Sequence, residues 1–398
     1  MGNVVLNGGT SGQITLQPTA IAGTNTLTLP AATGTVLTSS GDQTITGTMV
    51  MGSSFLRNKI INGAMVIDQR NAGASVTPTA NAYTLDRWNY YCGGVASKAS
   101  VQRNAGSVTP PTGFSNYIGL TSLSAYSVAA TDRFGVQQAI EGFNTADLAW
   151  GTANAKTITL SFWVYSSLTG TFGGVIQNDA GTQYYVYSYT ITAANTWQQK
   201  TITIPGSTTG VWRTDNGGGV FVGFSIGAGS TYLGTAGSWG STLYFGPTGQ
   251  TSIVGTNGAT FYITGIQFEI GTVATPFEQR QYQQELALCQ RYAYVIPKNT
   301  FMGTTGQCYG VNVAQGAIPL PVSMRSAPTL TAVSDFTGFN VYTSTATTSQ
   351  MTVFAAAASA TTELFFWNMN AGSVLTAGNA TLIQKSPTNV PLIFSAEL

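Results

Sequence analysis

The chain has 398 residues, and its 15 Lys and Arg and 14 Asp and Glu make up only 7% of them, against about 25% in a typical soluble domain. A net charge of +1 without a basic run disfavours a nucleic-acid partner, and the absence of His excludes Ser-His-Asp and Cys-His catalysis and His-ligated zinc. Hydrophobic residues make up 43% of the chain, so several cores can form under a surface of mainly hydroxyl and backbone groups.

The first 54 residues are rich in Thr, Gly, Ala and Ser, with Asp42 as their one charged residue and without an aromatic residue. Short alternating segments that end near Gly or Pro predict strands at residues 13–16, 26–30, 34–38 and 43–47. Such strands bury too little surface to close a monomeric core. We therefore expect residues 1–54 to intertwine with identical chains; the alternative is a Ser- and Thr-rich linker, which the alternating Ile, Leu and Val disfavour.

A domain boundary is predicted near residue 54, because charged residues and the first Trp appear after Phe55. Residues 55–280 then alternate between strand-like segments and loops of Gly, Ser and Asn, without a βαβ pattern. This arrangement favours a β-sandwich of the jelly-roll kind. The strands are predicted at residues 88–91, 117–121, 134–140, 157–165, 171–177, 183–192, 199–204, 220–226, 242–245 and 260–270.

One helix is predicted, over residues 281–296, where helix-forming residues are abundant and Pro297 follows. It is expected to connect two β domains. Leu286, Cys289 and Ala293 have a heptad-like spacing, so the helix could pack around a threefold axis or, as an alternative, on its own domain.

The region 297–398 returns to short strands and predicts a second, smaller β-sandwich. Its strands are predicted at residues 309–313, 329–333, 340–342, 350–354, 363–368 and 391–394. The whole chain is thus expected to be all-β apart from the connecting helix.

Aromatic side chains are the first candidates for a binding site, because their faces stack on sugar rings. Tyr185, Tyr187 and Tyr189 share one face of a predicted strand, and Tyr184 points to the other. They form either a binding platform or part of a half-buried strand. Further candidates, in loops or at strand ends, are Trp197, Trp212 and Trp239, whereas Trp88 and Trp163 lie in apolar patterns typical of a core.

Several motifs resemble tail fibre proteins of tailed bacteriophages. The segment NKIINGAMVIDQR at 58–70, with YTLDRW at 83–88, resembles the opening of a carbohydrate-binding-module-like jelly roll in those fibres. GIQFEIG at 265–271, ATPFE at 274–278 and ELALCQRY at 285–292 resemble its closing part. LTLPAATGTVLT at 27–38 looks like a fibre shaft or attachment segment, and PVSMRSAP at 321–328 looks like the start of a small C-terminal domain.

The resemblance implies a homotrimeric virion component. Residues 1–54 would attach it to tail, baseplate or adaptor proteins, and the globular parts would bind a polysaccharide on the host surface. Three weak sites on one trimer would multiply avidity. An alternative is a purely structural collar or head fibre protein.

No enzymatic activity is expected, because glycoside hydrolysis needs two carboxylates about 5–10 Å apart. The acids are scattered, with Glu141 and Asp147, and Glu269 and Glu278, as the nearest pairs considered, and the repeat of a β-helix depolymerase is absent. No cofactor is expected, and the sequence leaves open whether a structural calcium ion is bound.

The cysteines Cys92, Cys289 and Cys308 are widely spaced and predict free thiols rather than disulfides or a metal site. The sequence shows neither a signal-peptide pattern nor a long apolar stretch, so membrane insertion is not expected. The expected location is the virion, after assembly in the bacterial cytoplasm.

Overall fold

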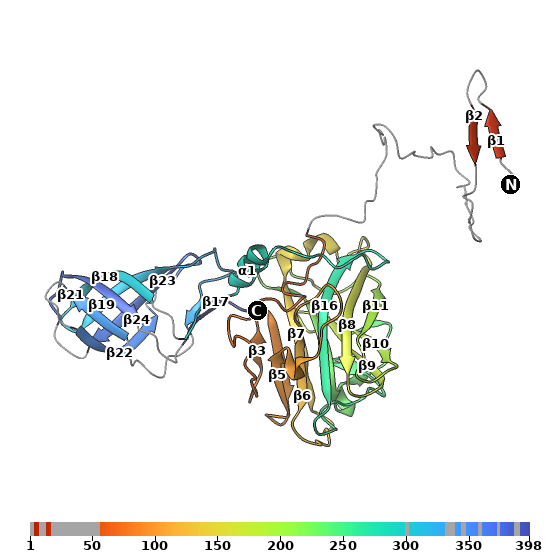
Figure 1. The fold of residues 1–398 in the computed structure, drawn as a ribbon, viewed down its shortest axis with the longest axis horizontal. Helices are drawn as coiled ribbons and strands as arrows, with labels where there is room; N and C mark the ends of the chain where they lie inside the picture. Colours follow the sequence, from red (N-terminus) through yellow and green to blue (C-terminus); the bar gives the residue numbers. More distant parts are fainter. Residues whose placement is uncertain are drawn as a thin grey trace. The chain divides into compact units, whose positions relative to one another are not determined.

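The computed structural model (Figure 1) describes residues 4–7, 13–16, 56–298, 302–330, 339–343, 348–356, 360–371, 375–385 and 391–398. The chain divides into two compact units, Met1–Gly52 and Ser53–Leu398. In the first unit, β1 (Val4–Asn7) and β2 (Gln13–Leu16) form an antiparallel pair, and β2 coincides with a predicted strand. The other strands expected before residue 54 lie outside the described residues.

The centre of the second unit is a β-sandwich, as predicted. One sheet has seven strands in the order β14-β10-β9-β12-β7-β4-β3, and the other has five in the order β11-β8-β16-β6-β5. The first comprises β3 (Ala82–Leu85), β4 (Trp88–Gly93), β7 (Arg133–Glu141), β9 (Gly170–Asn178), β10 (Tyr184–Ile191), β12 (Gly218–Ala228) and β14 (Trp239–Gly240). The second comprises β5 (Ala99–Arg103), β6 (Ile118–Ser122), β8 (Ile158–Ser166), β11 (Gln198–Ile204) and β16 (Thr260–Ile270).

The two sheets pack face to face through the alternate residues of each strand. Phe162 on β8 meets Phe224 on β12, with ring centroids 5.1 Å apart. Trp88 is fully buried and contacts Phe224 at 6.3 Å. Most predicted strands are confirmed because this alternation is visible in the sequence. The short strands β3 and β5 were missed, since Ala, Thr, Ser and Gln dilute their apolar pattern.

The strand predicted at 242–245 is wrong. This part of the chain belongs to a long loop that folds over the outer face of the seven-stranded sheet and contains two-residue strands, β13 (Leu233–Gly234), β14 and β15 (Gly246–Pro247). Phe245 packs against Tyr91 and Tyr232 there, at 5.3 and 5.4 Å. Aromatic packing, rather than strand pairing, therefore orders this segment.

The helix is shorter than predicted. It spans α1 (Tyr282–Gln290), and the chain then enters β17 (Ala293–Ile296), which pairs with β25 (Leu392–Ser395). β25 also pairs with β20 (Thr329–Leu330), the described start of the strand predicted at 329–333. The strand pairing overrides the helix propensity of residues 293–296. Cys289 is buried against Ile61 and Ile67, so the helix packs on its own domain.

The C-terminal strands form a closed barrel instead of the predicted second sandwich. The barrel order is β18-β19-β23-β22-β21-β24, so the ring has no free edge. The strands are β18 (Met302–Gly310), β19 (Val313–Pro319), β21 (Phe339–Thr343), β22 (Thr348–Ala356), β23 (Leu364–Ala371) and β24 (Ala380–Lys385). The strand predicted at 309–313 falls on the turn from β18 to β19.

The closed barrel places small residues against the indole ring of Trp367. Trp367 is fully buried, and an added Cβ would lie 2.1 Å from its indole at Gly316 and 3.1 Å at Gly306. The two glycines therefore let β18 and β19 lie directly against the ring. Such a three-dimensional fit has no period in the sequence, which is why the barrel was not predicted.

All three cysteines are free, with Cys289 and Cys308 buried and Cys92 half-buried. Burial raises the pKa of each thiol. Within the described ranges, no helix is both long and apolar enough to cross a membrane.

Candidate functional site

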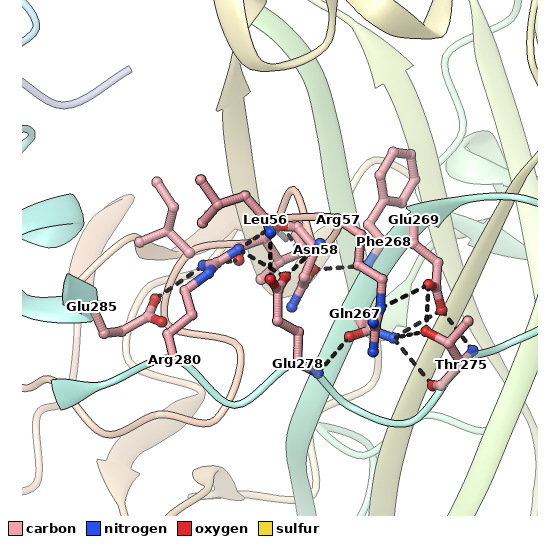
Figure 2. A network of polar contacts seen from close by, with 12 residues as sticks. Leu56, Arg57, Asn58, Gln267, Phe268, Glu269, Thr275, Glu278, Arg280 and Glu285 are labelled. Carbon is pink, nitrogen blue, oxygen red and sulfur yellow. Dashed lines mark hydrogen bonds and ion pairs between the residues drawn. The ribbon is translucent and has the colours of Figure 1, made fainter. Parts of the chain in front are cut away.

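The opening and closing motifs of the sandwich meet in one polar network (Figure 2). The Asn58 side chain donates to the Ile266 carbonyl at 3.1 Å and accepts from the Phe268 amide at 3.0 Å. The Glu278 carboxylate accepts from the amides of Leu56 and Asn58. These contacts join segments more than 200 positions apart in the sequence, so they hold the two ends of the sandwich domain together. We call this network the clamp.

Two further charged residues extend this clamp to the helix. The Arg280 guanidinium donates to the backbone carbonyls of Asn58 and Ile60 and pairs with Glu285 at 3.4 Å. The Glu285 carboxylate accepts from the Asn62 amide. These bonds attach residues 58–62, at the start of the sandwich domain, to α1 and the residues just before it.

The carboxylates considered for catalysis have structural partners. Glu269 accepts from the Thr275 hydroxyl at 2.6 Å and pairs with Arg57 at 3.4 Å. Glu141 accepts from Arg291 and from the Tyr292 hydroxyl, both at 2.6 Å.

Burial raises the pKa of the Glu141 carboxyl, but hydrogen bonds from Arg291 and Tyr292 outweigh burial and hold this pKa below its ordinary value. Asp147 is bound by the Lys59 ammonium at 2.7 Å. Each of these acids is therefore bound by a neighbouring side chain.

The tyrosine stripe faces the core, which corrects its interpretation as an exposed platform. Tyr185, Tyr187 and Tyr189 are 5%, 1% and 8% exposed, because their face of β10 lies against the five-stranded sheet. Tyr189 contacts Phe162 of that sheet at 5.0 Å, and the Tyr187 hydroxyl donates to the Gly223 carbonyl at 2.7 Å. A sugar ring has no access to these faces.

Trp212 and Trp239 come together, although they lie far apart in the sequence. Their ring centroids are 5.6 Å apart, and both rings contact the buried Trp150. The indole N–H of Trp212 donates to the Thr209 carbonyl, and that of Trp239 donates to the Pro205 carbonyl. Both side chains are half-buried, so they fill the edge of the sandwich and leave only part of each ring for a ligand.

Trp197 belongs to a different aromatic cluster. It packs on Tyr165 and Tyr117 at 5.5 and 5.4 Å, and its N–H donates to the Thr109 carbonyl. Tyr165 stacks on Tyr262 at 5.3 Å with an interplanar angle of 8°. The structure thus separates Trp197 from the other two candidates.

A hollow of about 160 Å³ lies beside Trp239. Its accessible aromatic surface comes mainly from the half-buried Trp239 and Tyr244. Tyr184, which the sequence placed on the face of β10 opposite the stripe, also lines the hollow but is only 6% exposed. Exposed hydroxyl and backbone groups complete the hollow. The lining residues are Tyr184, Val186, Thr235, Ser238, Trp239, Gly240, Thr242 and Tyr244.

Aromatic faces beside hydroxyl groups suit a sugar, which presents an apolar ring face and several hydroxyls. The sequence analysis identified Trp239 but missed Tyr244 and the hydroxyl residues. The sequence feature that could have identified these residues is the high content of Ser, Thr, Gly and aromatic residues in the loop that contains β14.

In the part of the chain that the structure describes, no group of three or more Cys, Asp or Glu side chains could hold a metal ion.

Neither a protein-family model nor the sequence of a curated protein matches this chain. Among the solved structures to which it is similar are three proteins that cover about half of it. The enzymatically active domain of bacteriophage CBA120 tailspike protein 4 is 12% identical, with a TM-score of 0.31, over 54% of this chain and 22% of that chain. The match therefore covers less than a quarter of the tailspike chain.

A putative sugar binding protein from Bacteroides thetaiotaomicron is 12% identical, with a TM-score of 0.30, over 54% of this chain and 100% of that chain. A family 11 carbohydrate-binding module from Clostridium thermocellum is 16% identical, with a TM-score of 0.25, over 52% of this chain and 100% of that chain. The all-β architecture described above rests on the strand pairing of this chain itself.

Proposed function

We propose that this chain is a bacteriophage tail fibre protein that binds a glycan on the host cell surface through the hollow beside Trp239. The observation that carries the binding site is the set of side chains there, with the half-buried rings of Trp239 and Tyr244 and the hydroxyls of Thr235, Ser238 and Thr242 around one small space. The motifs at both ends of the sandwich support the fibre assignment by their resemblance to phage fibres.

The chain is proposed to act as a homotrimer in the virion. Residues 1–54 would attach it to tail, baseplate or adaptor proteins, in keeping with their resemblance to fibre attachment segments. A hollow of about 160 Å³ has room for a small part of a polysaccharide, so each site would bind weakly. Three sites per trimer would raise the overall avidity without any new contact.

Adhesion without cleavage is part of the proposal. Glu141, Glu269 and Glu278 are held by the hydrogen bonds and ion pairs of the clamp regions, which disfavours their use as an acid and base. The alternative of a collar or head fibre protein predicts the same clamps but no glycan binding.

The test is a binding assay on an array of bacterial surface polysaccharides with the full-length chain. Tyr244→Ala should weaken binding about tenfold or more, because it removes one aromatic wall of the hollow. Tyr282→Ala is the matched control, since Tyr282 is 58% exposed on α1 and should leave binding unchanged. Reducing sugars are followed in parallel and should not be released.

Three outcomes would contradict the proposal. Equal binding by Tyr244→Ala and the unmodified chain would exclude the hollow as the site. The absence of binding to every polysaccharide and to intact bacteria would favour the purely structural role. Release of reducing sugar would assign a hydrolytic function to the carboxylates.

A further inference from the structure

A row of carboxamide side chains crosses the outside of the C-terminal barrel. Gln307 on β18 lies opposite Gln315 on β19, and Gln315 lies opposite Asn368 on β23. Neighbouring strands are about 4.8 Å apart, so the row extends over about 10 Å. In the next row on the same face, Ala317 lies opposite Phe366.

The alternation of each strand shows that this row points away from the core. Cys308, Ala314 and Trp367 are the sequence neighbours of the three amides, and they are 2%, 0% and 0% exposed. Because successive side chains of a strand point to opposite faces, the amides lie on the outer face. Gln307 is exposed, and Gln315 and Asn368 are half-buried.

These residues line a depression of about 600 Å³. The backbone of Gly306 and Gly316 forms part of it, and the Trp367 indole supports these two glycines from the inside. Thr305 adds a hydroxyl, Phe366 adds a half-buried aromatic ring, and none of the described residues that line the depression is charged.

One acceptor in the depression has unmet hydrogen-bonding capacity. The Asn368 Oδ1 atom is buried and accepts no hydrogen bond from the described residues. A buried polar atom of this kind is costly unless a partner satisfies it. Because this atom has almost no exposed surface, the Asn368 side chain must rotate before Oδ1 can accept a hydrogen bond from a ligand hydroxyl.

From this arrangement we infer that the barrel carries a second binding site, for a neutral oligosaccharide of about two sugar rings. Each carboxamide offers donors and an acceptor, as sugar hydroxyls require, and the Phe366 ring offers an apolar face. The uncharged lining favours a neutral sugar over an acidic one. The site goes beyond the proposed function of the sandwich, because it lies on another domain and uses none of the residues around Trp239.

A second occupant class is a further copy of this chain, since Leu364 on β23 and Leu382 on β24 are 37% and 46% exposed. The observations favour the sugar, because the depression itself is lined by three amides and a hydroxyl. An interface between copies would bury these polar groups.

The experiment uses the full chain with Tyr244→Ala as background, so that binding at the sandwich is weakened. The probes are neutral disaccharides to tetrasaccharides of glucose, galactose, mannose and N-acetylglucosamine, titrated by calorimetry. Asn368→Leu and Gln315→Leu should each weaken binding tenfold or more. Gln199→Leu, at an exposed amide on β11, is the matched control and should have no effect.

Phe366→Leu provides an independent test, because it keeps an apolar residue of similar size and removes the aromatic face. It should weaken binding while the circular dichroism spectrum stays unchanged. Binding should also be insensitive to salt, since both partners are neutral.

The inference is overturned if the Tyr244→Ala background binds none of the probes, or if the barrel variants bind as well as it does. A change in molecular mass on sedimentation with Gln315→Leu would instead assign the depression to a contact between copies. Asn368→Leu alone should leave binding at the hollow beside Trp239 intact, so the two sites can fail separately.

Discussion

The sandwich and the barrel are both antiparallel β structures, but they are held together by different interactions. In the sandwich, ion pairs are buried at the places where distant segments meet, as between Arg87, 1% exposed, and Glu397. In the barrel, the residues that the structure describes contribute no ion pair, and the strands enclose Trp367 and small residues. The few charges of this chain are therefore concentrated at junctions.

The difference follows from what each region has to connect. Neighbouring barrel strands are held by their backbone hydrogen bonds even where they lie far apart in the chain, as β18 and β24 do, whereas the ends of the sandwich domain meet through side chains. Arg87 and Glu397 lie 310 positions apart, and Arg291 and Glu141 lie 150 apart. A buried charge is costly without its partner, so such pairs give each junction a specific geometry.

The largest expected effect is at the junction of β25 with the sandwich. Glu397→Gln leaves Arg87 and Arg70 without their shared carboxylate, and Arg87 is almost fully buried. We expect a loss of about 3–5 kcal/mol in the free energy of unfolding, measured in denaturant by tryptophan fluorescence. Asp179→Asn, which removes an exposed partner of Arg213, is the control and should change little. Similar losses in both variants would refute the distinction between junction and surface pairs.

The stability of the barrel should depend on the volume of its inward-facing side chains rather than on charge. Gly316→Ala places a methyl group 2.1 Å from the Trp367 indole, so the ring or the strand must move. We expect the barrel to lose about 1–3 kcal/mol of stability, together with a change in the near-ultraviolet circular dichroism of Trp367. Gly310→Ala, where a Cβ meets nothing within 4 Å, is the matched control. An unchanged spectrum for Gly316→Ala would show that the ring does not contact the glycine strands.

Within the sandwich core, removal of the hydroxyl of Tyr187 and removal of that of Tyr189 should change the free energy of unfolding by different amounts. Tyr187→Phe removes a hydrogen bond to the Gly223 carbonyl and should cost about 1 kcal/mol. Tyr189→Phe removes a buried hydroxyl that has no hydrogen-bond partner among the described residues, so stability should stay the same or rise. Chemical denaturation of the two variants side by side provides the measurement. A larger loss for Tyr189→Phe would contradict the hydrogen-bond assignment.

The smallest expected effect is on the acid limb of the stability curve. The pKa of Glu141 is lowered in the folded state from its ordinary value of 4.5, so its ionised form contributes stability above that pH. This contribution is lost as the pH falls through the folded-state pKa. Glu141→Gln should therefore be less stable than the unmodified chain at pH 7, and the difference should shrink below pH 4.5. A difference that is constant with pH would contradict the assignment.

The sequence by itself determined the all-β class, the β-sandwich and the positions of most of its strands. The strand predicted at 260–270 has the bounds of β16, although a register shift between Thr264 and Gln267 interrupts the alternation of its apolar residues. The motifs at 58–70 and 265–292 identified the two ends of the domain. Only the structure showed that Asn58 and Glu278 act there as a clamp, since contacts between distant segments leave no local pattern.

The tertiary structure alone decided which face of a strand is buried and how the C-terminal strands close. The period of two in β10 separates Tyr184 from the stripe of Tyr185, Tyr187 and Tyr189. Tyrosine occurs both on half-buried strands and at binding surfaces, so the pattern alone does not decide whether the stripe is buried. The barrel depends on the fit of Trp367 against Gly306 and Gly316, which no sequence period records. Alternation predicts two faces, whereas burial depends on what other segments place against each face.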